Sequence, residues 1–215
     1  MTSNAQSLAR LMAWLSPVFP TGGFAYSAGL ESAAHDSHVI DEASLGRWLS
    51  HSITRGGVWN ETVLLAAAHK RSATLSDLTA LALAIAPTME RYHETCGQGA
   101  AFIDAASAWG EADIARETPL PVAVGALAAH HGLAESDTLI AFAQTTVSNQ
   151  CQAAIRLSLI GQAGAARLMA KLEPTIVATS KQATGSTLDD LGGCAFMADI
   201  LSARHETLEP RIFLS

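Results

Sequence analysis

The serine at position 27 is the first residue in this sequence that could do chemistry. Residues 25–29 read AYSAG, one residue away from the G-x-S-x-G turn that presents the nucleophile of many hydrolases. That turn follows a β-strand, whereas a loop rich in proline and glycine precedes Ser27 and a helical pattern surrounds it. We therefore expect Ser27 to be a small residue in a packed helix. A small α-helical hydrolase that pairs Ser27 with a histidine is kept as an alternative.

Histidine and cysteine are the next candidates, because both residue types bind transition metals. His93 and Cys96 lie three residues apart and could share one face of a helix. The three cysteines are widely spaced and form no C-x-x-C pair, so we expect neither a structural zinc site nor a disulfide framework. A nickel-binding metallochaperone built on these scattered ligands is kept as a second alternative. The acidic residues expected to form only a solvated face are Glu90, Glu94, Asp104, Glu111 and Asp113.

Two segments have compositions typical of interaction surfaces. Residues 15–31 carry Phe19, Phe24 and Tyr26 in a loop that prolines and glycines constrain, which lowers the entropic cost of presenting aromatic anchors. Residues 204–215 mix charged and apolar side chains. Either segment could instead pack on the body of the chain, and both alternatives stay open. The tail residues of interest are Arg204, His205, Glu206, Leu208, Arg211, Ile212 and Phe213.

The elements that must position these segments are all expected to be helices. Apolar residues recur at helical spacing along the chain, and proline, glycine or a polar cap marks the ends. In the first helix, Leu8, Leu11, Met12 and Leu15 form the apolar face. The expected helices cover approximately residues 8–15, 24–35, 42–55, 59–71, 75–86, 88–110, 120–131, 136–160, 165–172, a short stretch from 174, and 187–203. We predict one all-α domain over residues 1–215, with about ten helices and an irregular tail that docks on the domain or on a partner.

Composition excludes several classes of protein. The formal net charge of −7 argues against a nucleic-acid-binding protein, which needs a basic surface. The longest apolar stretch, residues 78–86, is too short to span a bilayer, and the N-terminus lacks the pattern of a signal peptide. With 49% hydrophobic and only 15% charged residues, we expect some apolar surface that a partner covers. No phosphate-binding motif occurs, so we expect no bound nucleotide. Cysteine usage favours the cytoplasm.

Both candidate segments carry a resemblance. Residues 15–31 read LSPVFPTGGFAYSAGLE and residues 204–215 read RHETLEPRIFLS. They resemble the terminal signatures of the urease accessory protein UreF family, approximately L-S-P-x-F-P-x-G-x-F-x-Y-S-x-G-L-E and R-H-E-T-L-x-x-R-L-F-x-S. Residues 148–162 also resemble the middle of that family. The chain departs from the family at Leu214, where a basic residue is expected, and at Gly23, where alanine is frequent.

The resemblance implies an all-α accessory protein that is not an enzyme and that helps to load nickel into apo-urease. It also implies a complex with the accessory protein UreD (also called UreH) and with the GTPase UreG, which such proteins bridge and modulate. Nickel and GTP would belong to UreG, so we expect no stably bound cofactor on this chain. We expect a homodimer.

The resemblance also suggests where partners bind. We expect the N-terminal loop and the tail to pack together and form the surface for UreG, with the Tyr26 hydroxyl accepting a hydrogen bond from the Arg211 guanidinium. Glu31 and His35, one helical turn apart, would line a polar path for a cation. The apolar anchors, to the body of the chain or to UreD, would be Leu208, Ile212 and Phe213. The other expected partner-binding residues are Phe19, Phe24, Ser27, Arg204, His205 and Glu206.

Overall fold

A computed structural model of the chain describes residues 4–215. Within this range it contains ten α-helices, three short 3-10 helices and no β-strand, so the all-α prediction is confirmed. The α-helices are α1 (Asn4–Trp14), α2 (Leu30–His35), α3 (Glu42–Arg55), α4 (Gly57–Lys70), α5 (Leu75–Ala84), α6 (Met89–Ala106), α7 (Leu120–His130), α8 (Glu135–Arg156), α9 (Gln162–Thr184) and α10 (Phe196–His205). The 3-10 helices are η1 (Gly23–Ala25), η2 (Ser107–Trp109) and η3 (Leu188–Asp190).

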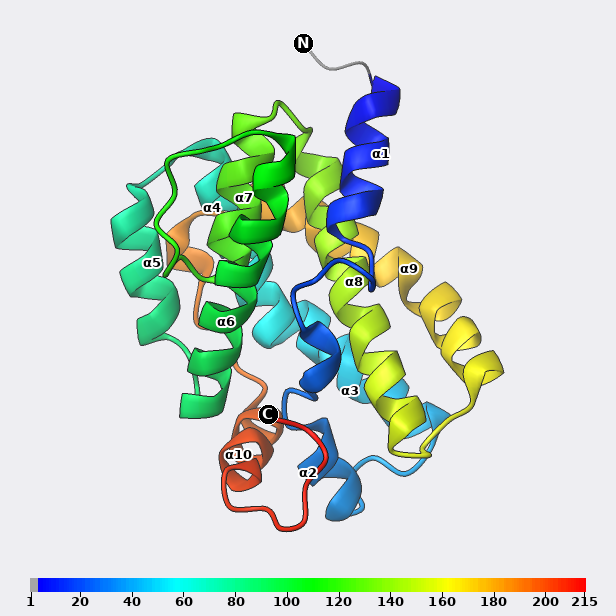
Figure 1. The fold of residues 1–215 in the computed structure, drawn as a ribbon. Coiled ribbons are helices and arrows are strands. Elements are labelled where there is room, and N and C mark those ends of the chain that lie inside the picture. Colours follow the sequence, from blue (N-terminus) through cyan, green and yellow to red (C-terminus); the bar gives the residue numbers. More distant parts are fainter. Residues whose placement is uncertain (1–3) are drawn as a thin grey trace.

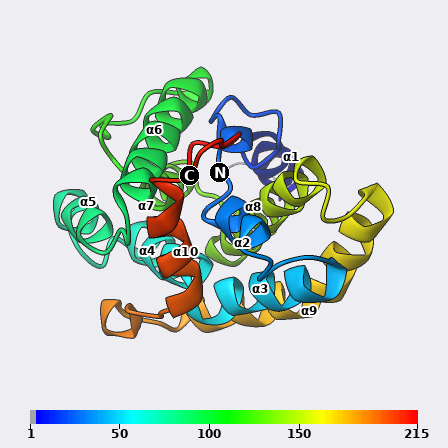
Figure 2. The ribbon, with the colours of Figure 1, turned by 90° about the horizontal axis from the view of Figure 1, so that it is seen from below.

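Two apolar helices, α4 and α7, lie against each other in the interior, and the other helices cover them (Figure 1). A separate cluster of buried side chains joins α3, α8 and α9. Leu201 of α10 and Phe213 of the tail belong to that second cluster. Helices α2 and α10 lie side by side at one end of the molecule, and the chain returns from there so that its C-terminus lies beside the N-terminal loop (Figures 1 and 2). None of the described helices is long and apolar enough to cross a membrane.

Polar side chains cap the starts of α3, α5 and α6, whereas α8, expected to start at about Ser136, begins after Ala134 without a side-chain cap. The Asp41 carboxylate accepts from the backbone N–H of Ser44 at 2.8 Å, and the Ser44 hydroxyl accepts from the Asp41 N–H in return. Thr74 caps α5 and Thr88 caps α6 in the same way, through their side-chain oxygens. These short-range hydrogen bonds satisfy donors that helix geometry leaves free, which is why sequence identifies them.

The helix predicted over residues 24–35 is wrong in its first half. The chain forms η1 and then a turn, and α2 begins only at Leu30. Ala28 and Gly29 both have positive φ, 51° and 81°, which ends any continuous right-handed helix at this point. Ser27 therefore lies in a tight turn rather than in a helix.

Several other boundaries differ from the prediction, including that of α8, which ends at Arg156 rather than near residue 160. Residues 165–172 and the stretch from Pro174 form one helix, α9, with the proline inside it. An interior proline costs a hydrogen bond, and here buried residues on both sides of it hold the helix together. Thr187 caps η3 rather than a long helix, and α10 starts only at Phe196. The helix also continues past residue 203, so the tail begins with a helical turn.

The apolar face predicted for α1 is partly wrong. Leu11 and Trp14 are buried, whereas Leu8 is 57% and Met12 68% exposed. The Trp14 ring packs edge-on against Phe102 at the end of α1 that reaches the body. The other end of α1 projects away from the molecule (Figure 1), so part of its apolar face, at Leu8 and Met12, stays exposed.

Candidate functional site: the loop–tail interface

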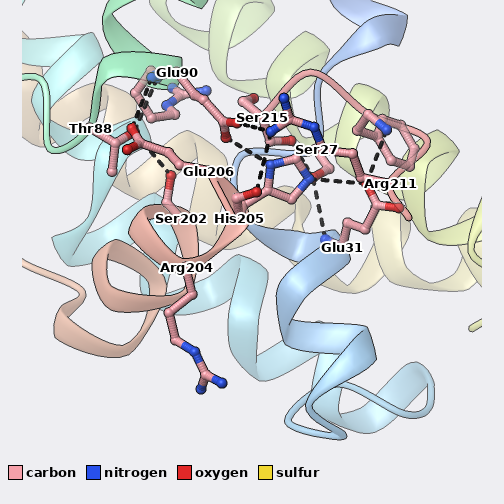
Figure 3. Close-up of polar contacts among 12 residues, drawn as sticks. Ser27, Glu31, Thr88, Glu90, Ser202, Arg204, His205, Glu206, Arg211 and Ser215 are labelled. Carbon is pink, nitrogen blue, oxygen red and sulfur yellow. Dashed lines mark hydrogen bonds and ion pairs between the residues drawn. The ribbon is translucent and has the colours of Figure 1, made fainter. Parts of the chain in front are cut away.

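The C-terminal tail lies directly against the N-terminal loop, as the sequence predicted. The backbone N–H of Leu214 donates to the carbonyl of Ala25 at 2.8 Å, and the N–H of Ser27 donates to the carbonyl of Ser215 at 2.8 Å. The Ser27 hydroxyl also donates to the Ser215 carbonyl. We call the contact between residues 15–31 and 204–215 the loop–tail interface (Figure 3).

One buried carboxylate, that of Glu31 in the first turn of α2, fastens the tail to the body. It accepts from the backbone N–H of Ile212 at 2.9 Å and from that of Phe213 at 3.0 Å. It also lies 3.0 Å from Nε2 of His205. The Glu31 residue is only 7% exposed. A carboxylate accepts several hydrogen bonds at once, so this one side chain satisfies three donors of the C-terminal segment.

A second carboxylate, that of Glu90 on α6, completes the polar cluster. One of its oxygens lies 2.7 Å from Nδ1 of His205, and the other accepts from the Arg211 guanidinium. Arg211 also donates to the His205 carbonyl at 3.3 Å. Figure 3 shows the His205 ring between the two carboxylates, with α2 on one side and α6 on the other. The tail is therefore fixed to two separate helices.

The start of the tail is held by the N-terminus of α6. The Glu206 carboxylate accepts from the backbone N–H of Met89 at 2.9 Å and lies 3.4 Å from that of Glu90. A negative charge is favourable at this end of a helix, because free N–H groups and the helix dipole both point there. At the far end of the tail, the Ser215 hydroxyl donates to Glu94 at 2.6 Å.

Arg156, at the end of α8, contacts both the N-terminal loop and the tail. Its guanidinium lies over the Phe213 ring, 4.2 Å from the ring centre, and donates to the carbonyl of Phe24. Phe213 itself is 2% exposed and packs in the core, so it is an anchor to the body of the chain. The Arg156 side chain thereby fixes the loop backbone relative to the tail.

Several large apolar side chains of the interface face solvent. Phe24 is 75% exposed, Ile212 57% and Leu214 58%. Val18, between the two prolines of the loop, is 89% exposed. These side chains come from a loop and a tail whose backbones are hydrogen-bonded to each other. These hydrogen bonds hold exposed apolar side chains in fixed positions, which suits recognition of another protein.

Comparison with known proteins now places the chain. The UreF family model matches residues 39–173. The chain belongs to the UreF family. It is 48% identical to the urease accessory protein UreF of Mesorhizobium japonicum, with the whole of both chains covered. Similar proteins of the same name from Rhizobium etli (strain CIAT 652) and Brucella ovis are 47% and 45% identical, covering 98% and 97% of this chain and 97% and 94% of theirs.

Two details of the predicted interface are wrong. Arg211 donates to Glu90 and to the His205 carbonyl, not to Tyr26. The Tyr26 hydroxyl lies beside Gly97 of α6, where burial and the negative charge of Glu94 raise its pKa. Glu31 and His35 do not line a common path, because Glu31 points inward to the tail. The His35 ring is largely exposed and contacts Asp36 at 3.1 Å.

The remaining predicted residues divide between the surface and the body. Phe19 is half-buried and packs against Phe102 and Trp109, so it belongs to an aromatic cluster of the body. Arg204 points away from the cluster and pairs with Asp36 at 2.7 Å (Figure 3). Leu208 is half-buried in the turn after α10.

Sequence reasoning missed the acidic partners of the tail. Glu90 and Glu94 were expected on a solvated face, and both are in fact largely buried beneath the tail. Their spacing of four residues puts them on one side of α6, with Arg91 between them. That spacing was visible in the sequence, but partners more than a hundred residues away were not. Arg156 was also missed, although it lies within the middle segment that resembles the family.

The structure does not assemble the catalytic pair of the hydrolase alternative. The Ser27 hydroxyl contacts the Ser215 carbonyl and the backbone N–H of Glu31, and it contacts no histidine. The nearest candidate base, His205, has a carboxylate at each ring nitrogen. Ser27 is buried and closes the turn between the loop and α2, which accounts for a small hydroxyl residue here.

A cavity of about 380 Å³ lies beside the interface, between α4, α6 and α8. Its lining includes Glu61, Arg91 and Glu94, and Arg91 forms ion pairs with both carboxylates. Burial raises the pKa of Glu61, although the charge of Arg91 opposes this shift. Within residues 4–215, no three histidine, cysteine, aspartate or glutamate side chains are grouped so that they could hold a metal ion.

Two of the cysteines, Cys151 and Cys194, are expected to differ sharply in their reactivity with alkylating reagents. Cys151 is fully buried, and burial raises its pKa to about 11, so almost none of it is thiolate near pH 8. Cys194 is exposed, although burial of its thiol and the nearby Asp199 raise its pKa as well. Alkylation with iodoacetamide, followed by peptide mass spectrometry, should modify Cys194 first and Cys151 only after unfolding. If Cys151 in the folded chain is modified as fast as Cys194, then the Cys151 side chain on α8 is not buried in solution.

Proposed function

We propose that the chain is a urease accessory protein that acts in maturation of the urease nickel centre by holding partner proteins together. Relatives named urease accessory protein UreF match it along its whole length at 45–48% identity, which supports this role. The loop–tail interface supports a binding role in particular. It fixes exposed apolar side chains on a scaffold of buried ion pairs, and no nucleophile–base pair accompanies it.

The proposed partners are UreD (UreH), the GTPase UreG and the urease apoprotein. The chain bridges UreD and UreG and modulates the GTPase, while nickel and GTP bind to UreG rather than to this chain. We assign UreG to the exposed side of the loop–tail interface. The chain contributes to the complex as a homodimer, and the complex acts in the cytoplasm. The uncovered apolar face of α1, with Leu8 and Met12, is consistent with further protein contacts.

The single observation that carries the assignment of the interface is the setting of Arg211. Its side chain is 39% exposed and is held by Glu90 beside the exposed Ile212 and Leu214. Arginine and aromatic residues surrounded by apolar side chains are typical of the few residues that dominate binding energy. Phe24 supplies the aromatic residue on the loop side, 75% exposed.

Arg211→Ala and Phe24→Ala are each expected to weaken UreG binding by at least about tenfold, the effect of losing a residue that dominates an interface. The measurement is co-expression with UreD and UreG, followed by size exclusion with light scattering and titration of the purified components. Arg116→Ala is the matched control, because Arg116 is also exposed and paired with a carboxylate, that of Asp104.

The two variants separate direct contact from support. Phe24→Ala removes an exposed ring without touching the buried ion pairs, so loss of UreG in this variant reports a lost contact. If both variants bind UreG as well as Arg116→Ala does, the assignment of this surface is wrong. If the unaltered chain elutes apart from UreD and UreG under all conditions, the bridging role itself is wrong.

A further inference from the structure

Four ionisable side chains at the loop–tail interface contact one another in a chain of hydrogen bonds. Glu31 and Glu90 come from the body of the chain, whereas His205 and Arg211 come from its C-terminal segment. The His205 side chain has no exposed surface. Its Nδ1 lies 2.7 Å from a Glu90 oxygen and its Nε2 lies 3.0 Å from a Glu31 oxygen.

Each of these two contacts needs one hydrogen between a ring nitrogen and a carboxylate oxygen. A neutral imidazole has one N–H, so with two ionised carboxylates only one contact would have a hydrogen. The other nitrogen would then direct its lone pair at a carboxylate oxygen in a site that water does not reach, which is costly. The docked arrangement therefore needs two protons shared between the His205 ring and the two carboxyl groups.

We propose that docking of residues 206–215 is coupled to uptake of a proton by the cluster of His205, Glu31 and Glu90, so that the loop–tail interface assembles at lower pH and loosens as the pH rises. This inference rests on the proposed function for its consequence, since the docked segment is part of the surface assigned to the GTPase. The coupling itself concerns this chain alone and can be tested without a partner.

Charged groups reach His205 from three elements. Its ring contacts Glu31 on α2 and Glu90 on α6, and Arg211 of the tail donates to its backbone carbonyl. On α10 itself, Arg204 points away from the cluster and pairs with Asp36. Glu206 points to the N-terminus of α6 and accepts from backbone N–H groups there.

The direction of the pH dependence follows from the two states. The two contacts of the docked ring hold two protons, whereas a histidine released into water keeps only one above about pH 6.5. Above that pH, docking takes up a proton. The ratio of docked to released segment should then fall by up to about tenfold for each pH unit. Below that pH the released histidine keeps both protons, and this dependence disappears.

Hydrogen exchange of the full chain tests the coupling. The reporters are the backbone N–H groups of Ile212, Phe213 and Leu214, which bond to Glu31 and Ala25 in the docked segment. Each exchange rate is divided by the intrinsic rate at the same pH. Between about pH 6 and pH 8.5 their protection is expected to fall by at least about tenfold, while amides within α4 keep theirs.

Glu90→Gln provides the discriminating variant. A glutamine at this position donates an N–H to the unprotonated nitrogen of a neutral His205, so docking no longer needs the second proton. We expect the protection of the tail in this variant to lose most of its pH dependence. His35→Gln, which removes an exposed histidine on α2, is the control and should keep the profile of the unaltered chain.

Either of two outcomes overturns the coupling. One is hydrogen-exchange protection of the tail in the unaltered chain that stays constant over this pH range. This outcome refutes the coupling even if the tail of Glu90→Gln fails to dock. The other is a Glu90→Gln variant that docks and keeps the full pH dependence. A chain whose tail follows the expected profile but captures no UreG at any pH would refute the proposed function and leave the proton coupling standing.

Discussion

Glu31→Ala is expected to release the C-terminal segment from the body of the chain. The carboxylate that this change removes is the buried partner of the His205 ring and of two backbone N–H groups, those of Ile212 and Phe213. Leaving a buried donor without an acceptor costs about 1–3 kcal/mol, and this change leaves the backbone N–H groups of Ile212 and Phe213 without theirs. The segment escapes this cost only by leaving its site. We therefore expect residues 206–215 to lose protection from hydrogen exchange while α4 and α7 retain theirs.

Glu42→Ala is the matched control for this change. The Glu42 carboxylate pairs with the Arg167 guanidinium, but both side chains are exposed, 37% for Glu42 and 64% for Arg167. A solvated pair of this kind contributes about 0–1 kcal/mol. Urea unfolding and hydrogen exchange of the two variants should therefore differ clearly. If Glu31→Ala keeps a protected tail and the stability of Glu42→Ala, then Glu31 does not hold the tail in solution.

The expected loss has a functional counterpart. Glu31 is part of the loop signature that resembles the family, yet its side chain is buried and cannot contact a partner while the tail is docked. Its effect on UreG binding would thus act through the position of Arg211 and Ile212. In Glu31→Ala we expect UreG binding to fall together with tail protection, whereas in Phe24→Ala binding should fall while the tail stays protected.

Short-range signals explain which parts of the fold could be predicted. Asp41 and Thr74 cap helices through bonds that span three residues, so the sequence around them suffices. The turn before α2 depends on Ala28 at a φ of 51°, which local preference for alanine argues against. The hydrogen bonds from Leu214 and Ser27 across the loop–tail interface hold that turn in place. Tertiary contacts of this kind leave no local pattern.

The same distinction applies to the site. The composition of the loop and the tail indicated that these two segments matter, and the structure confirms that they pack together. The acidic residues that receive the tail could not be identified in this way. Glu90 and Glu94 lie on a helix that also carries Gly97 and Gly99, so α6 shows no strong apolar stripe to reveal which side is covered. Their burial depends on a segment that arrives from the opposite end of the chain.

Gly125→Ala is expected to be among the most destabilising single substitutions in the chain. Gly125 lies where α7 crosses α4, and a Cβ at this position would lie 2.3 Å from the carbonyl oxygen of Leu65 and 3.0 Å from the Cβ of Ala68. The first of these atoms is backbone, so no side-chain rotation relieves the clash and the helices must move apart. Overpacking a core costs about 1–3 kcal/mol and occasionally more. Because α7 is buried around most of its circumference, we expect a value of about 3 kcal/mol.

Gly57→Ala offers a control on α4 itself. A Cβ at Gly57 meets no atom within 4 Å, and the residue lies in the first turn of the helix. Alanine there should be neutral or stabilise the fold by up to about 1 kcal/mol, because it restricts the unfolded chain more than glycine does. Urea unfolding followed by circular dichroism measures both variants. Equal stability of the two variants would mean that α4 and α7 do not touch at Gly125. The position of α6 depends on this central packing, and the docking site of the tail depends on α6, so both would be in question.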